Sequence, residues 1–445
     1  MPRRRFHRRR FVGLSLGVPL AGAAWAWADR AALCIAGKPE EPDNPLVERA
    51  KAAAIEVLKP SRKDLEHGLE LHARSVVFDA YGFAPRAAVD GEVVRAAIES
   101  GASAIELQDL EEDMSMTRCV NDPDERAEFL GAWKAAGVTC IFQNAGEEGE
   151  DPTRLMKRLA RFTYVTDMLR PVVAKAVTAE DVVAAKKQNW HCLCFTGNGV
   201  PLPQQWVSVA EELRYIRIFF QLGIRMMHLT YQRRNVIGDG CGEAANAGLS
   251  DFGRAVVAEM NRVGVIPDVA HSGWQTSLEA AKASTRPVVA SHTTCAALHK
   301  HIRSKPDEVI RAIADTGGYV GICCVPAFLG GKGDLAAMLD HVDYVVRRFG
   351  ADRVAIGTDA AYVSRHAARQ STRTPKRPPA RPRWAALWPS GSFSSVSSTA
   401  AQSLAWTNWP LFTVGLVQRG YRDEDIQKII GGNVLRVLRE TARQA

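Results

Sequence analysis

Short apolar runs rich in β-branched residues alternate along the chain with longer amphipathic stretches. The runs are almost continuously hydrophobic and carry polar residues mainly at their ends, which is typical of strands that are buried on both faces of a parallel sheet. They lie at residues 75–81, 102–110, 138–145, 191–198, 225–232, 265–272, 287–293, 317–325 and 354–360.

The intervening stretches have apolar residues at the three- and four-residue spacing of a helix with one buried face. The clearest are residues 207–222, 249–263, 277–283, 306–315 and 334–349. Eight strand–helix units predict an α/β fold, a closed (β/α)8 barrel of the TIM type. Because there are nine candidate strands, we expect 102–110 to be an accessory element. An open doubly wound sheet is the alternative, but no Gly-x-Gly-x-x-Gly follows the first strand.

Three segments lie outside this alternation. Residues 44–71 have a helical pattern and predict an N-terminal helical extension, and residues 421–439 predict a closing helix. Residues 365–403 are rich in Pro and basic residues and then in Ser, which indicates a long loop after the last strand. We expect this insertion to be solvated, with a cover over the barrel mouth as the alternative.

Several predicted strands end in polar residues that can do chemistry. A barrel gathers the carboxyl ends of its strands on one face, where enzymes with this fold place their active sites. The polar ends are Asp79-Ala80-Tyr81, Thr196-Gly197-Asn198, Thr230-Tyr231-Gln232, Asp268-Val269-Ala270-His271, Ser291-His292-Thr293 and Gly357-Thr358-Asp359.

The positive charge of the chain is concentrated in two segments. The formal charge is +8, but six Arg in residues 1–28 and seven Lys or Arg in 365–383 account for more than this excess. The remaining chain is mildly acidic, so we expect no nucleic-acid partner.

Residues 1–28 read as a signal peptide, with an Arg-rich start, an apolar centre and a small-x-small cleavage site at Ala26-Trp27-Ala28. The mature chain would then be a single domain, 29–445.

The signal is of the twin-arginine type, because Arg8-Arg9-Arg10-Phe11-Val12 resembles the motif of that export pathway. We therefore expect a periplasmic or exported protein without a stable membrane span after cleavage; the alternative is an uncleaved anchor. Cys192, Cys194, Cys323 and Cys324 lie in apolar runs, so we interpret them as core residues rather than as disulfides or a metal site.

From residue 220 onward the chain resembles the membrane (renal-type) dipeptidases, zinc peptidase family M19. The resemblance rests on the blocks GIRMMHLT (223–230), GLSDFG (248–253), EMNRVGVIPDVAH (259–271), SHT (291–293), RSKPDE (303–308), GTD (357–359) and GNVLRV (432–437). These blocks follow the family's order over roughly half of the chain.

The resemblance implies a (β/α)8 barrel in which zinc ions activate a hydroxide that cleaves dipeptides next to a free carboxylate. It implies that His271 and His292 ligate zinc, that Arg303 pairs with the substrate carboxylate, and that Asp359 handles protons. The residue types agree, because imidazoles at successive strand ends can share an ion and an Arg fork matches a planar carboxylate. The implied partner is a small dipeptide-like molecule. The sequence leaves undecided whether the chain forms a homodimer.

The chain departs from the family at several ligand positions. The first strand of the family ends in Asp-x-His-x-Asp, and Tyr81 and Phe83 replace the last two of these residues here. The third family strand carries a bridging Glu, whereas residues 195–200 contain no acid. Tyr231 replaces a substrate-contacting His and becomes the candidate substrate-binding residue. We therefore expect one zinc ion rather than two.

Three functional interpretations stay open from the sequence. The first is an M19-like metal-dependent hydrolase with one ion on His271, His292 and Asp359. In the second, Asp239, Cys241 or Glu243 rebuilds the second metal site. In the third, the barrel is a non-catalytic homologue that binds a small carboxylate ligand.

The export signal gives the first testable prediction. Changing Arg8 and Arg9 together to Lys should leave the precursor in the cytoplasm, because the twin-arginine pathway reads the arginine pair itself. Cell fractionation followed by immunoblotting measures this. Normal accumulation of the double variant in the periplasm would remove the argument for export by this route.

Overall fold

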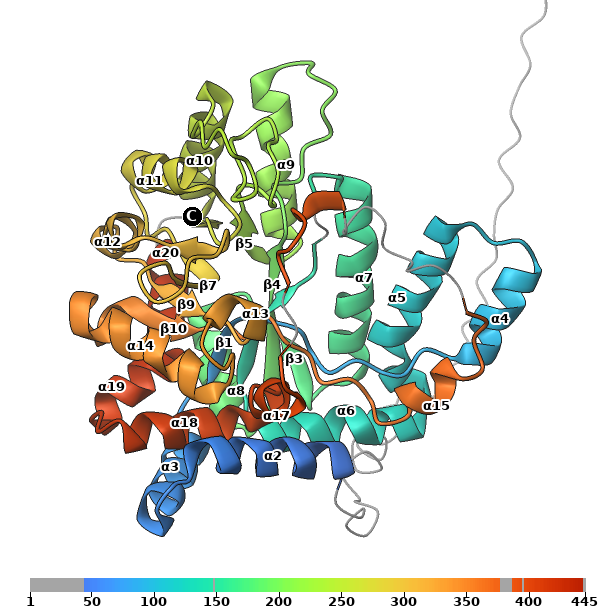
Figure 1. The fold of residues 1–445 in the computed structure, drawn as a ribbon. Helices are drawn as coiled ribbons and strands as arrows, with labels where there is room; N and C mark the ends of the chain where they lie inside the picture. The colour runs from blue at the N-terminus through green and yellow to red at the C-terminus, as the bar shows by residue number, and fades with distance from the viewer. Residues whose placement is uncertain (1–43, 147–148, 377–385, 394–395, 443–445) are drawn as a thin grey trace, which may run out of the picture. The chain divides into compact units, whose positions relative to one another are not determined.

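The computed structural model describes residues 44–146, 149–376, 386–393 and 396–442. The predicted signal peptide, residues 1–28, lies outside the described residues. Residues 44–445 form one compact unit, in which helices surround a central group of parallel strands (Figure 1).

Eight parallel strands form the barrel that the sequence predicted. One sheet runs in the order β1-β2-β4-β5-β6 and the other contains β10, β9 and β7. The bounds are β1 Phe78–Gly82, β2 Cys140–Asn144, β4 His191–Gly197, β5 Ile224–His228, β6 Ile266–Asp268, β7 Ala290–Cys295, β9 Val320–Ile322 and β10 Val354–Ile356. Two shorter strands that the pattern did not predict add to the edges, β3 Val173–Lys175 beside β4 and β8 Ser304–Lys305 beside β7.

The two sheets meet at two seams. At the first, the backbone N–H of Val269 donates to Val289 (2.8 Å), and that of Val289 donates to Pro267 (3.0 Å). At the second, the N–H of Asp359 donates to the carbonyl of Tyr81 (2.9 Å). These bonds join β6 to β7 and β10 to β1, so the fold is a TIM-type barrel.

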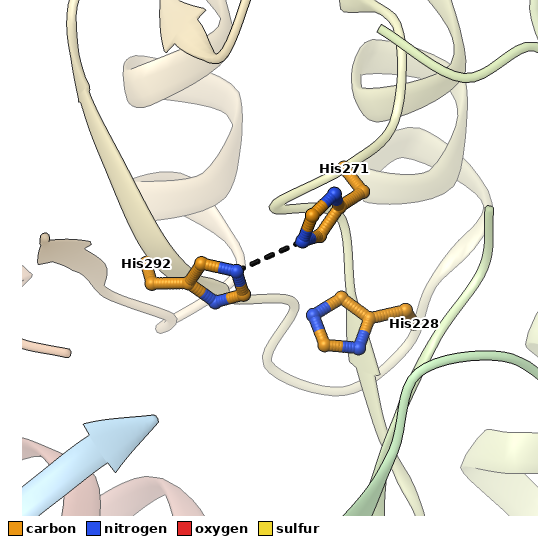
Figure 2. Close-up of side chains that lie close together, drawn as sticks. All are labelled: His228, His271 and His292. Carbon is orange, nitrogen blue, oxygen red and sulfur yellow. Dashed lines mark hydrogen bonds between the residues drawn. The ribbon is translucent and has the colours of Figure 1, made fainter. Parts of the chain in front are cut away.

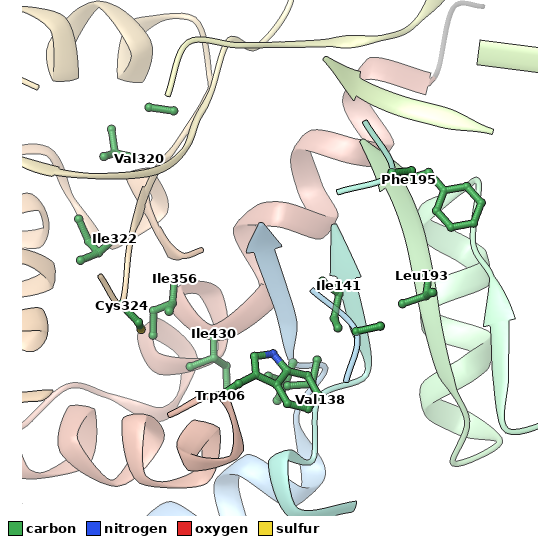
Figure 3. Packing of buried hydrophobic residues seen from close by; sticks show 14 of the residues in the cluster. Val138, Ile141, Leu193, Phe195, Val320, Ile322, Cys324, Ile356, Trp406 and Ile430 are labelled. Carbon is green, nitrogen blue, oxygen red and sulfur yellow. The ribbon is translucent and has the colours of Figure 1, made fainter. Parts of the chain in front are cut away.

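The strands are short and fully buried, which explains why their sequence is apolar on both faces. Ile141, Leu193 and Phe195 on one sheet and Val320, Ile322 and Ile356 on the other belong to one packed core (Figure 3). The eight cysteines of the described residues are all free, and Cys192 and Cys194 pack in the barrel core, as predicted.

The helices cover the strands and begin at identifiable caps. Ser208, Ser250 and Asp334, for example, each accept a backbone N–H of the first turn of their helix. The α-helices are α2 Pro45–Leu58, α3 Arg62–Arg74, α4 Gly91–Glu99, α5 Ala104–Asn121, α6 Pro123–Ala136, α7 Pro152–Met168, α8 Ala179–Lys187, α9 Val209–Gln221, α10 Asp251–Val263, α11 Trp274–Ala283, α12 Asp307–Asp315, α13 Pro326–Leu329, α14 Leu335–Phe349, α15 Ala367–Ser371, α17 Ser398–Ser403, α18 Trp409–Gln418, α19 Asp423–Gln427 and α20 Asn433–Ala442. Short turns of other helical types lie at η1 Ala351–Arg353, η2 Trp406–Asn408 and η3 Lys428–Gly432.

Two predicted elements are wrong in type or continuity. Most of the run 102–110 belongs to helix α5, which begins at Ala104 after a capping box formed by Ser103 and Glu106. This local signal outweighs the apolar residues nearby. The predicted closing helix over 421–439 is broken into α19, η3 and α20. The break lies at Gly431, where an added Cβ would stand 2.4 Å from the carbonyl oxygen of Val76.

The insertion of residues 365–403 differs from the solvated loop that we expected. Its described part includes α15 and α17, and the ring of Trp388 stacks on that of Phe328 with centroids 5.8 Å apart. His301 Nε2 also lies 3.0 Å from the carbonyl oxygen of Ser392. Aromatic packing holds this segment against the barrel. Among the described residues, no helix combines the length and apolar character that crossing a membrane requires.

Asp79 bridges the seam between β1 and β10 with its side chain. The carboxylate is fully buried and accepts the backbone N–H (2.9 Å) and the hydroxyl (2.6 Å) of Thr358. The indole N–H of Trp406 (3.2 Å) is a further donor. Burial raises the pKa of Asp79 to about 7 in spite of these bonds, because removal from water disfavours the charged form.

This raised pKa predicts how stability depends on pH. The folded state binds the proton of Asp79 more tightly than the unfolded state, so the associated stability is complete below about pH 4 and is lost as the pH rises to about 7. The loss amounts to at most about 4 kcal/mol. Asp79→Asn should remove this component, and denaturant unfolding of both proteins between pH 4 and 8 measures it. Equal pH slopes in the two proteins would contradict the assignment.

Candidate metal centre

Three buried histidines converge inside the barrel (Figure 2). His228 is the last residue of β5, His271 follows β6 by three residues, and His292 lies within β7. One ring nitrogen of each lies within 4.8 Å of the others. The sequence predicted His271 and His292 as metal ligands but not His228.

The two predicted ligands lie at a spacing that suits one shared ion. His271 Nε2 and His292 Nε2 are 2.9 Å apart. Two nitrogens bound tetrahedrally to one zinc at about 2.0–2.1 Å are separated by about 3.3 Å. A shift of a few tenths of an ångström therefore brings both imidazoles to the geometry of a common metal ion.

Neighbouring groups hold the rings in place. His228 Nδ1 donates to the carbonyl of Gly197 (2.9 Å), and His292 Nδ1 lies 2.8 Å from Ser291 Oγ. Tyr81 stacks on His292 with ring centroids 3.9 Å apart. Tyr231 stacks in the same way on His271, at 4.0 Å.

The surroundings favour neutral imidazoles, which is the form that binds metals. Burial and the nearby Arg303 guanidinium lower the pKa values of His271 and His292 well below the usual range. Burial also lowers the pKa of His228, although the Asp268 carboxylate opposes this shift. Burial lowers the pKa of the Lys305 ammonium to about 7.

Several polar atoms around the histidines are buried without a hydrogen bond. They are His228 Nε2, His271 Nδ1, Asp268 Oδ2 and Arg303 Nη1. An unsatisfied buried polar atom costs free energy unless a ligand or ion completes it. This donor set of imidazoles, with one carboxylate beside it, fits a divalent metal ion.

The other half of the family's site is filled by aromatic side chains. The ring of Tyr81 covers His292, and its hydroxyl donates to Asn198 Oδ1 (2.5 Å). Phe83 packs edge-on against Tyr81 at 5.9 Å. A phenol, a phenyl ring and an amide offer little to a second dication, and the expectation of a single ion stays a prediction.

The alternative ligands Asp239, Cys241 and Glu243 do not join the histidine cluster. Asp239 forms an ion pair with Arg234 (2.5 Å), and the Cys241 thiol donates to Gln232 Oε1 (2.6 Å). Glu243 accepts the backbone N–H of Arg234 (3.2 Å). Each of these side chains is engaged with the loop that carries it.

The remaining predicted residues lie around the same site. Tyr231, Asp359 and His271 line a cavity of about 330 Å³ at the barrel mouth. Trp388 and Phe393 of the insertion line it as well, so this segment covers part of the mouth. Arg303 is buried at the inner side: its Nη2 donates to the carbonyl of His292 (2.8 Å) and its Nε to that of Ala270 (3.3 Å).

Sequence reasoning missed His228 because it placed the end of the strand too late. The run of residues 225–232 predicts a strand that ends at Thr230, Tyr231 and Gln232. The strand ends at His228 itself. The sequence feature that could have identified His228 is an imidazole directly after the run Ile224-Arg225-Met226-Met227.

Comparison with known proteins supports the resemblance. The family model "Membrane dipeptidase (Peptidase family M19)" matches residues 108–368, more than half of the chain. The dipeptidase tcpJ of Claviceps purpurea is 30% identical over 230 residues, which cover 51% of this chain and 46% of that protein. The match therefore spans about half the length of this curated relative.

Solved structures show the same fold. An amidohydrolase from Pseudomonas aeruginosa superposes with a TM-score of 0.61 and 24% identity, covering 84% of this chain and 98% of its own. The probable dipeptidase PvdM from the same organism gives a TM-score of 0.58 and 18% identity, covering 86% and 100%. At these identities the likeness shows the barrel fold alone. Together with the family match, it leads to one conclusion: this chain belongs to the membrane dipeptidase family, peptidase family M19.

Proposed function

We propose that the protein is a metal-dependent hydrolase that cleaves the amide bond of a dipeptide or similar small molecule with a free carboxylate. Family membership supports the reaction class. Histidine ligands at successive strand ends support a zinc ion as the cofactor. The proposed location is the periplasm or the cell exterior, on the strength of the signal sequence alone.

The observation that carries this proposal is the unsatisfied nitrogen of Arg303. Two nitrogens of the guanidinium are bonded to carbonyls next to the histidines, and Nη1 is buried without a hydrogen bond. A buried guanidinium N–H without an acceptor is costly, and a carboxylate is the acceptor that an Arg fork binds best. A substrate carboxylate would therefore be bound beside the metal centre.

Each residue of the site then has a distinct role. A bound zinc ion lowers the pKa of its water to about 7 and polarises a carbonyl group. His271 and His292 hold the ion, and Tyr231 packs along the substrate from its position over His271. Asp359 holds or releases a proton at its carboxylate, from a position on the cavity wall.

The backbone at Asp359 supports its assignment to the chemistry. Its φ of 52° lies in the left-handed region, which non-glycine residues seldom adopt. Its N–H donates to Tyr81 across the second seam of the barrel, and this bond holds the residue at the mouth.

The role of Arg303 can be tested by Arg303→Lys. Lysine keeps the charge but loses the fork, so KM for a free-carboxylate dipeptide should rise by about tenfold or more, which corresponds to about 1.4 kcal/mol. Steady-state kinetics with the free dipeptide and its C-terminal amide measure the effect, and the variant should lose the preference for the free acid.

Arg225→Lys is the matched control, because Arg225 also donates to backbone carbonyls, those of Val177 and Phe220, away from the cavity. It should leave KM unchanged. An unchanged KM in Arg303→Lys would contradict the assigned role. Binding of the dipeptide without turnover by zinc-loaded wild-type protein would instead favour the non-catalytic homologue.

A further inference from the structure

We propose that His228 is a third metal ligand, so that the barrel binds one divalent ion through three imidazoles with Asp268 as the counter-charge. This inference deepens the proposed function and rests on it for the presence of a resident metal. His228 lies in the block GIRMMHLT, but the ligand set that the family resemblance implies does not include it. The hydrogen bonds around its ring carry this inference.

The bond to Gly197 fixes which nitrogen of His228 is free. A carbonyl oxygen can only accept, so Nδ1 at 2.9 Å must carry the hydrogen. In the neutral ring, Nε2 then presents a lone pair. Nε2 is also the nitrogen that faces the other two histidines (Figure 2).

The lone pair on His228 Nε2 lies close to a second hydrogen-bond acceptor, the Asp268 carboxylate. Asp268 Oδ2 lies 3.1 Å from His228 Nε2, and both atoms are fully buried without a hydrogen bond. Two acceptors this close in a dry interior repel each other unless a positive charge lies beside them. A cation bound to Nε2 would convert the repulsion into attraction.

The position of Asp268 is fixed independently of the metal. Its Oδ1 accepts the backbone N–H groups of Ala270 (2.9 Å) and Ser291 (3.1 Å). Oδ2 lies near His228, but among the described residues the group of ligand atoms that all lie within 4.8 Å of one another consists of the three imidazoles and does not include Asp268. Asp268 therefore acts beside the ligands as a compensating charge rather than as a fourth ligand.

Charge compensation matters because basic side chains lie close to the three histidines. Arg303 lies beside His271 and His292, and the ammonium of Lys305 is bonded to the carbonyl of Ser272 (2.6 Å). Three neutral imidazoles leave the ion with its full charge. The Asp268 carboxylate, 3.1 Å from the proposed ligand nitrogen of His228, offsets part of it by direct attraction.

The alternative is that a proton occupies Nε2, making His228 an imidazolium paired with Asp268. Such a ring could not bind a metal, because its lone pair would be used. The two cases differ in whether His228 is needed for metal retention, which can be measured without any assay of activity.

The experiment compares three glutamine variants with the wild-type protein. His228→Gln and His271→Gln each remove one proposed ligand. His341→Gln is the matched control: its ring is equally buried, with Nδ1 accepting from the N–H of Cys295 and Nε2 donating to the carbonyl of Leu329. Each protein is purified, loaded with zinc, desalted and analysed for metal per chain, and thermal unfolding verifies folding.

Wild type and His341→Gln should retain one equivalent of zinc, and the other two variants should retain little. With cobalt in place of zinc, the visible absorption of the wild-type protein should change in His228→Gln, since the ligand set of the ion changes. Full retention and an unaltered cobalt spectrum in His228→Gln would overturn the proposal, as would a wild-type protein that retains no metal.

A variant of Asp268 tests the counter-charge. Asp268→Asn keeps Oδ1 for the two backbone N–H groups but places an amide N–H against His228 Nε2, where it competes with the ion. Zinc affinity should fall by about 10- to 100-fold, and an unchanged affinity would contradict this role. Metal retention that depends on His228, without hydrolysis of any dipeptide, would reject the proposed function and leave this inference standing.

Discussion

A buried carboxylate at each of two seams holds this barrel closed. Asp79 joins β1 to β10 through Thr358, and Asp268 joins β6 to β7 through the N–H of Ser291. Between these strands the regular parallel ladder is reduced to isolated bonds. The N–H groups that each carboxylate accepts offset part of the cost of burying it. The same bonds fix the position of the adjacent strand.

The metal centre depends on the seam at Asp268. His271 and His292 come from opposite sides of it, and their nitrogens approach to 2.9 Å because Asp268 fixes the two strands relative to each other. The same carboxylate faces His228 with its second oxygen. One side chain thus bonds across the seam, helps to position two of the proposed ligands and places a carboxylate oxygen beside the third.

The sequence predicted most of the fold, and it singled out two of the three histidines that the structure brings together. Buried parallel strands are continuously apolar, so eight of the nine predicted strands were placed well, and the family blocks located His271, His292 and Arg303. Strand ends are harder to predict, because a strand ends where its hydrogen bonds to the neighbouring strands end, and the sequence does not show this point. The pattern therefore did not indicate that β5 ends at His228, before Leu229 and Thr230. Helix α5 was mistaken for a strand because its capping box was overlooked. The contact between Trp388 and Phe328 could not be foreseen, because packing of a Pro- and Ser-rich insertion depends on what lies beneath it.

The most direct measurement of the central claim is a crystal structure of zinc-loaded protein with anomalous diffraction recorded on both sides of the zinc edge. The anomalous signal locates each ion independently of any assay. The account predicts one strong peak, bound by nitrogens of His228, His271 and His292, with the Tyr81 ring still stacked on His292. Two peaks a few ångströms apart, or a single peak that His228 does not contact, would contradict it.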